Sequence, residues 1–193
     1  MAWSFSLLGI IDRPLMYAIA SHAISTIHLA DVQALSMTAW SFSCLGIMHM
    51  PLMQAIAKSA LPMMSEFDPQ GLGITAWAFS ALMLFNETLL NAISAESLHK
   101  IGDFRAQNLT NPAWAFATII VIDATLMDAI SAEVRAKIFE EDTQDLSLTV
   151  WSFAALSIYD EPLLNAIASA SRPRLFEFKS NEISNAVRSL STA

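Results

Sequence analysis

Apolar and polar positions recur along this chain with a constant step. Tryptophan occurs every 37 residues and is followed two positions later by phenylalanine. A glutamine position and an Ala-Ile pair keep the same step. The repeating residues are Trp3, Trp40, Trp77, Trp114 and Trp151; Gln33, Gln70, Gln107 and Gln144; and Ile19, Ile56, Ile93, Ile130 and Ile167. Self-similarity at a fixed step of this length indicates a repeat architecture.

Each unit of the repeat reads as two helices. In one copy Leu72, Ala76 and Phe79 follow one another at steps of four and three, which places them on one helix face. The pair Asp68-Pro69 is typical of a helix start, with Asp as N-cap and Pro at the first helical position. The second helix is predicted to begin at the equivalent residues Asp12, His49, Asn86, Asp123 and Asp160.

A single helical hairpin of this size cannot bury its apolar faces, whereas stacked copies can. The sequence therefore predicts an all-α fold, an α-solenoid of about five 37-residue helical-hairpin repeats. We expect one array over residues 1–193, with 178–193 as a partial or capping sixth unit in which Arg188 and Leu190 replace Trp and Phe. Pro112 falls inside one predicted first helix, where it should cause a kink or a late start capped by Asn111.

Composition narrows the class of protein. The chain has 193 residues, of which 54% are hydrophobic and 15% charged, so intrinsic disorder is excluded. The net charge of −8 excludes a general polyanion binder of the histone type. The single Cys44 rules out an internal disulfide and is expected to be a small core residue. Residues 32–57 lack Asp, Glu, Lys and Arg, but their polar side chains favour a buried helix pair over a membrane span.

Candidate catalytic chemistry is sparse. The four histidines occupy different repeat positions, and the five glycines form no phosphate-binding loop. We therefore expect no enzymatic activity, no metal and no cofactor. The acidic run Glu140, Glu141, Asp142 and Asp145 is expected to be a solvated turn. The Trp and Phe positions are expected to lie in the core, although aromatic side chains can also stack on unpaired bases.

Basic residues gather in the second half of the chain and follow the repeat. Lys100, Lys137 and Arg174 occupy one repeat position, and Arg135 and Arg172 occupy the position two residues earlier. Stacked helices would line these cations along one edge, where they could follow a nucleic-acid backbone. Alternatively, they complement the dipole at the end of each second helix.

The glutamine position lies at the opening of each first helix, next to positions that vary between copies. A constant scaffold with variable surface residues suits a modular reader of bases, because helical repeats can read about one base each. The same glutamines could instead bond a neighbouring helix end.

The repeat unit Gln-x-Leu-x-x-Thr-Ala-Trp-(Ala/Ser)-Phe, a turn, and Leu-Leu-x-Ala-Ile-(Ala/Ser) resembles the heptatricopeptide and octotricopeptide repeats of organelle RNA-binding proteins. It also resembles the helical repeats of RAP-domain and FAST-kinase-like proteins. The octotricopeptide signature Pro-Pro-Pro-Glu-Trp is missing here, and no RAP-like segment follows the repeats. The resemblance implies binding of single-stranded RNA in mitochondria or plastids, supporting RNA processing, stability or translation.

By this resemblance, polar residues at the first-helix openings would contact bases and the cations would contact phosphates. The candidate RNA-binding residues are Gln70, Gln107, Asn108, Thr110 and Gln144, with Lys100, Lys137, Arg174, Arg135 and Arg172. The alternative function is a protein-interaction scaffold, because solenoid grooves bind proteins readily and an acidic chain favours a basic peptide or protein. No targeting segment is visible, and without the resemblance a cytoplasmic location would be expected.

Overall fold

The computed structural model describes residues 2–9 and 11–192, without the side chains of Trp3, Phe5 and residues 187–192. The predicted exchange of Trp and Phe for Arg188 and Leu190 therefore lies outside the described side chains. Over the described residues the chain forms eleven α-helices and four 3-10 helices, which confirms the all-α class. The helices form two compact units, Met1–Glu96 and Ser97–Ala193.

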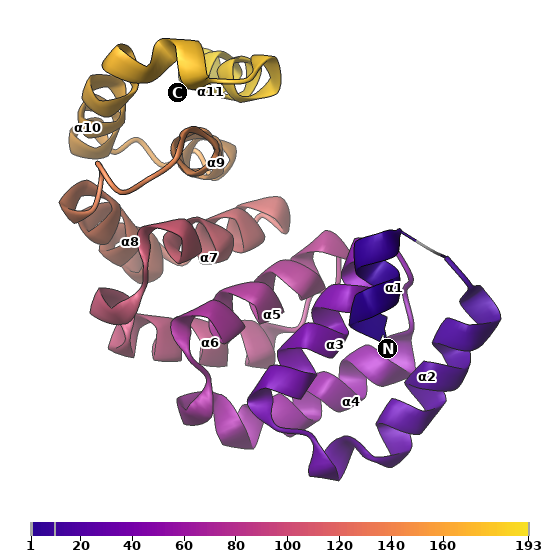
Figure 1. The fold of residues 1–193 in the computed structure, drawn as a ribbon. Helices are drawn as coiled ribbons and strands as arrows, with labels where there is room; N and C mark the ends of the chain where they lie inside the picture. The colour runs from indigo at the N-terminus through magenta and orange to yellow at the C-terminus, as the bar shows by residue number, and fades with distance from the viewer. Residues whose placement is uncertain (1, 10, 193) are drawn as a thin grey trace. The chain divides into compact units, whose positions relative to one another are not determined.

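Helices alternate between the two positions of a hairpin (Figure 1). The first helices are α1 (Ala2–Leu8), α3 (Val32–Cys44), α5 (Pro69–Ala81), α7 (Ala106–Thr118), α9 (Thr143–Ala155) and α11 (Ser180–Thr192). The second helices are α2 (Arg13–Ser25), α4 (Met50–Ala60), α6 (Glu87–His99), α8 (Ala124–Ala136) and α10 (Glu161–Ser171). Four 3-10 helices, η1 (Ile27–Leu29), η2 (Leu61–Glu66), η3 (Ile101–Asp103) and η4 (Arg172–Glu177), lie in the connections from second to first helices.

The predicted N-caps start the helices. The side chains of Asp12, His49, Asn86, Asp123 and Asp160 each accept a hydrogen bond from the backbone N–H three residues later. Asp31, Asp68 and Asp142 do the same for α3, α5 and α9. Lys179 cannot accept such a bond, so at α11 the direction is reversed and Glu182 accepts from the Lys179 N–H at 3.0 Å.

In the first unit, α3 contacts both α1 and α5, and α4 lies against α2 and α3 (Figure 1). The core contains Phe42 and Phe79, which fill the phenylalanine position of their repeats. Both are buried because each lies on the apolar, inward side of its helix. A buried polar bond also joins neighbouring repeats, since the Ser43 hydroxyl donates to the Ala78 carbonyl at 2.7 Å.

The second unit repeats this plan. Helix α9 contacts α7 and α11, and α10 contacts α8 and α9. Phe116 and Phe153 fill the core positions. The Ser147 hydroxyl donates to the Glu182 carbonyl at 3.0 Å, linking α9 to α11. Each unit is thus a stack of helical hairpins, as the repeat predicted.

Each first helix from α3 to α9 ends in a Schellman motif. In α7 the Val121 N–H donates to the Phe116 carbonyl at 2.9 Å, and Ile120 has a φ of 55°. Equivalent residues with positive φ are Gly46, Met83 and Ser157. This turn reverses the chain and delivers it to the N-cap of the second helix.

Three local expectations are corrected. Cys44 is exposed rather than in the core, because it lies on the outer face at the end of α3. The tryptophans at positions 40, 77, 114 and 151 are only partly buried, because they lie at the margin of the inner stripe. Helix α7 starts at Ala106 and continues through Pro112, so the alternative of a late start is wrong.

Over the described residues, no helix combines the length and the apolar character needed to cross a bilayer.

Candidate nucleic-acid interface

Among the described residues, α3, α5, α7 and α9 present one outward face that is built alike in each. In α9 the exposed or partly exposed residues Gln144, Leu148, Trp151 and Ala155 are separated by four, three and four positions. This spacing places them on one side of the helix. The equivalent residues are Gln33, Met37, Trp40 and Cys44 in α3; Gln70, Ile74, Trp77 and Ala81 in α5; and Gln107, Asn111, Trp114 and Thr118 in α7. We call these four sets the first-helix face.

In the first unit, part of this face forms a groove of about 340 Å³ between α3 and α5. Gln33 and Gln70 line it from consecutive repeats, together with the variable residues Met37 and Ile74. Glu66 and Asp68 add acidic groups to the lining. The groove therefore joins amide donors and acceptors, apolar contact surface and carboxylate acceptors, a set that can hydrogen bond the edge of a base.

In the second unit, the tryptophans of neighbouring repeats lie against each other. The ring centroids of Trp114 and Trp151 are 6.4 Å apart, with an angle of 32° between the planes. Both indoles remain partly exposed. A run of partly exposed aromatic rings one repeat apart is a surface on which bases can stack.

The predicted base-contacting residues differ in accessibility. Gln70, Gln107 and Gln144 are exposed at the second position of their helices, and Asn108 is partly exposed. Thr110 is buried, with 2% of its surface exposed, so its hydroxyl faces the interior beside α9. Burial and the Asp142 carboxylate raise the pKa of Asp145 to about 7, and the Thr110 hydroxyl opposes this rise. Asp145 thus sits next to Gln144 near the midpoint of its titration at neutral pH.

Two of the predicted phosphate-binding cations are engaged within the chain. Lys137 Nζ donates to the carbonyls of Gly102 and Phe104 and pairs with Glu133 at 2.7 Å. Arg174 Nη1 donates to the Glu141 carbonyl at 2.7 Å, and its Nε pairs with Glu177 at 3.0 Å. In both cases the cation reaches a connection one repeat earlier.

The other cations are placed differently. Arg135 and Arg172 are exposed, although Arg135 Nε also contacts the Ser131 carbonyl at 3.3 Å. Lys100 is partly buried, directly before η3. All five cations lie in or next to the connections that lead into first helices, which is the end where the glutamines begin those helices. The order of helices along the chain therefore places the predicted base-contacting residues and the predicted phosphate-binding cations at the same end of the hairpins.

The acidic turn before α9 is solvated at Glu140 and Asp142, which are exposed, but the expectation is wrong for Glu141. Glu141 is 1% exposed, and neither carboxylate oxygen has a hydrogen-bond partner. Phe67 and Phe104 fill the same repeat position in earlier copies and are buried too. Burial raises the pKa of Glu141 to about 8, and the charges of Asp145, Asp142 and Glu140 add to the rise while Lys137 opposes it. Glu141 therefore occupies an aromatic position of the core.

Sequence reasoning assigned the tryptophans to the core and so left them out of the candidate site. The signal that could have found them is the spacing of four and three that joins each glutamine, its variable neighbour and its tryptophan. Among the described residues, no three His, Cys, Asp or Glu side chains are grouped as metal ligands.

Comparison with known proteins supports an RNA-related function for this helical chain. No curated protein matches the sequence. The family model of the RNA-editing substrate-binding complex 6 protein matches residues 5–193, nearly the whole chain. The chain therefore belongs to the RNA-editing substrate-binding complex 6 protein family.

Proposed function

We propose that this chain is an RNA-binding subunit without catalytic activity, and that within each unit single-stranded RNA contacts the first-helix face. The observation that carries the proposal is the recurrence of an exposed glutamine, a variable residue and a partly exposed tryptophan on one side of α3, α5, α7 and α9. The glutamine would hydrogen bond a base edge, and the tryptophan would stack on a base. The variable residue would set the preference of each repeat.

Phosphates would be held at the end of the hairpins where the first helices begin. At α7, whose N-cap Arg105 makes no side-chain cap, the first N–H groups and the positive dipole end favour an anion. At α3, α5 and α9 the capping aspartates Asp31, Asp68 and Asp142 already occupy that place. Arg135, in the last turn of α8, and Arg172, in the connection that precedes α11, are exposed at the same end. These exposed guanidinium groups would supply local positive charge for phosphate in a chain whose net charge is −8.

The family description supports a role in RNA editing, in which this chain would help to hold the RNA substrate. We place that role in the mitochondrion and assign the units to the heptatricopeptide type, in which each hairpin would contact about one nucleotide. Under this proposal the chain contributes binding and positioning to RNA processing, and the chemistry belongs to other subunits.

A titration of the purified chain against a random pool of single-stranded RNA tests the proposal. We expect binding at physiological salt that weakens as salt rises, since phosphate contacts release counterions. The double variant Gln107→Ala/Gln144→Ala should bind roughly tenfold or more weakly, because each good amide–base contact contributes about 1–3 kcal/mol. In selected pools, Asn111→Leu should change the enriched base at one position and leave the others.

The matched control is Gln54→Ala/Asn165→Ala, which removes two exposed amides from second helices. It should bind RNA as the parent does. Equal losses in the two double variants, or no RNA binding by the parent even at low salt, would contradict the proposal.

A further inference from the structure

Large apolar side chains are exposed at the turns inside the hairpins, at the opposite end from the predicted phosphate contacts. Two residues after each Schellman residue the chain places Met48, Phe85, Ile122 or Tyr159, and all four are exposed. In the second unit the Schellman residue Ile120 is exposed as well, and Ile120, Ile122 and Tyr159 are 75%, 63% and 67% exposed. We call these three residues the turn edge.

The backbone conformation at Ile120 is strained by the presence of its side chain. Its φ of 55° is in the left-handed region, which a β-branched residue rarely adopts. Gly46 fills the equivalent position two repeats earlier and meets this geometry without strain. Because the Ile120 side chain also gains little burial within the chain, neither local conformation nor internal packing accounts for it. Strain of this kind is concentrated at functional sites.

The charged side chains around the turn edge are acidic. Asp123 and Asp160 cap α8 and α10 directly beside it, and Glu161 follows exposed. The sequence has no Lys or Arg between residues 106 and 134 or between 138 and 171. The cations of this unit whose side chains the structure describes lie instead at the other end of its hairpins. Phosphate would be repelled at the turn edge, and among its three side chains only Tyr159 has a ring on which a base could stack.

We infer that the turn edge is a docking surface for a partner protein, which presents apolar side chains flanked by lysine or arginine. Ile120, Ile122 and Tyr159 would be covered by the apolar side chains of the partner. Asp123, Asp160 and Glu161 would face its cations, which fixes orientation and speeds association. In this arrangement the chain binds RNA on its first-helix face and a partner protein at the turns inside its hairpins.

A defined probe tests this surface on the full chain. The probe is a fluorescent synthetic helical peptide of leucine and lysine, with leucine along one face, and its counterpart carries glutamate in place of lysine. We expect anisotropy to show binding of the leucine–lysine peptide at physiological salt and none of the glutamate peptide. Ile122→Ser/Tyr159→Ser should weaken binding by about tenfold or more, because each side chain loses apolar burial.

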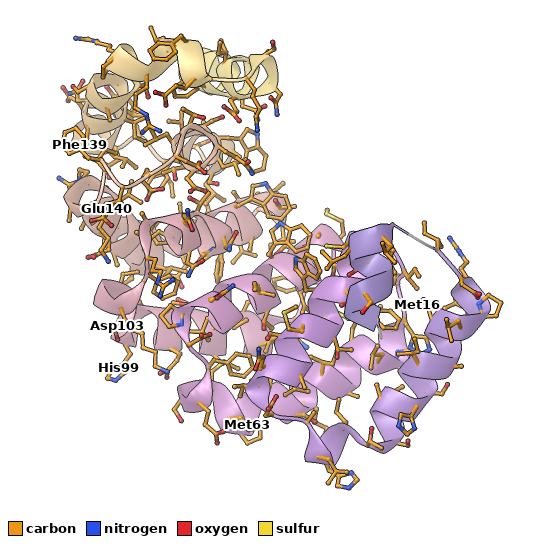
Figure 2. All side chains as sticks on the ribbon, viewed as in Figure 1. Met16, Met63, His99, Asp103, Phe139 and Glu140 are labelled. Atoms are coloured by element: carbon orange, nitrogen blue, oxygen red, sulfur yellow. The ribbon has the colours of Figure 1, made fainter. Side chains whose placement is uncertain are left out.

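Two further variants separate docking from folding and from general charge attraction. Ile120→Gly should weaken peptide binding yet raise Tm by roughly a few degrees, since it relieves the backbone. Phe139→Ser/Phe176→Ser removes two exposed aromatics at the opposite end of the hairpins and should leave peptide binding unchanged. Phe139 lies in the connection between α8 and α9 (Figure 2).

RNA binding by the same variants provides the last comparison. Ile122→Ser/Tyr159→Ser should bind single-stranded RNA as the parent does. The inference is overturned if the leucine–lysine peptide does not bind, if the turn-edge and Phe139/Phe176 variants lose peptide binding equally, or if the turn-edge variant loses RNA binding instead.

Discussion

The guanidinium of Arg174 donates a 2.7 Å hydrogen bond to the backbone carbonyl of Glu141, in the connection one repeat earlier. Lys137 makes the equivalent reach to the carbonyls of Gly102 and Phe104. The two cations occupy the same repeat position, and so do the carbonyls of Phe104 and Glu141. The repeat position that Lys137 and Arg174 share thus has a structural role in the second unit, because its cation bonds to the connection one repeat earlier.

Loss of the hydrogen bond from Arg174 to the Glu141 carbonyl should destabilise the protein. Arg174→Met keeps the apolar stem of the side chain but leaves the Glu141 carbonyl without its donor. We expect the free energy of unfolding to fall by about 1.5–3 kcal/mol, because hydrogen bonds to charged groups contribute about that much. Urea denaturation measures the change. Arg172→Met is the matched control at an exposed position and should leave stability unchanged within about 0.5 kcal/mol. Equal stability of the two variants would argue against a structural role for Arg174.

Stability should fall as pH rises through the neutral range. The pKa of Glu141 is raised from its ordinary value of 4.5 to about 8, and that of Asp145 from 3.8 to about 7. The folded chain therefore holds protons that the unfolded chain has released. The stabilising contribution is complete below about pH 4 and is lost progressively up to about pH 8. Thermal melts across this range should show Tm declining, with other carboxylates superimposing their own acid destabilisation at the low end.

A neutral isostere should remove most of that dependence. Glu141→Gln cannot ionise, so its stability should exceed that of the parent by on the order of 2 kcal/mol near pH 8, after allowance for solvent screening. Near pH 5 the two proteins should differ little. Glu140→Gln alters an exposed neighbour and should leave the pH profile nearly parallel to that of the parent. An unchanged slope in Glu141→Gln would show that Glu141 does not titrate in this range.

Glycine should be favoured at the left-handed turn positions. Ile120→Gly and Met83→Gly should each stabilise the protein by about 1 kcal/mol, because a side chain at positive φ costs roughly 1–2 kcal/mol and glycine adds some unfolded-state entropy. Gly46→Ala, with a φ of 61°, should destabilise by a similar amount. Differential scanning calorimetry of the three variants gives the comparison. A lower Tm for Ile120→Gly would mean that its exposed side chain stabilises the turn in another way.

Pro112 weakens the middle of α7. Helices α3, α5 and α9 carry threonine at this position, and Thr75 donates its hydroxyl to the Gly71 carbonyl at 2.8 Å. Pro112→Thr restores the backbone N–H toward the Asn108 carbonyl and adds an equivalent hydroxyl. We expect stabilisation of about 1–3 kcal/mol, because an interior proline removes a hydrogen bond and crowds the preceding turn. Urea denaturation would reveal it, and a destabilised variant would indicate that α7 has repacked around the proline ring.

Several features were predictable from the repeat. The second-helix N-caps Asp12, His49, Asn86, Asp123 and Asp160 are where the sequence placed them, because a cap bond spans only three residues. The buried phenylalanines follow from the same local periodicity. Cys44 and Glu141 were misplaced because composition alone does not show on which side of a helix or connection a residue falls. Arg135 and Arg172 remain RNA-contact predictions.

By itself the sequence determined the all-α class, the 37-residue hairpins and the helix starts, since these depend on contacts within a few residues and on an apolar stripe that repeats. Tertiary structure alone decided the environment of each repeated position. It left Trp114 and Trp151 partly exposed and beside each other, buried Glu141 at a phenylalanine position, and joined Arg174 to a carbonyl 33 residues earlier. These outcomes depend on how neighbouring hairpins pack, and that packing sets desolvation and partners for side chains whose local sequence is the same.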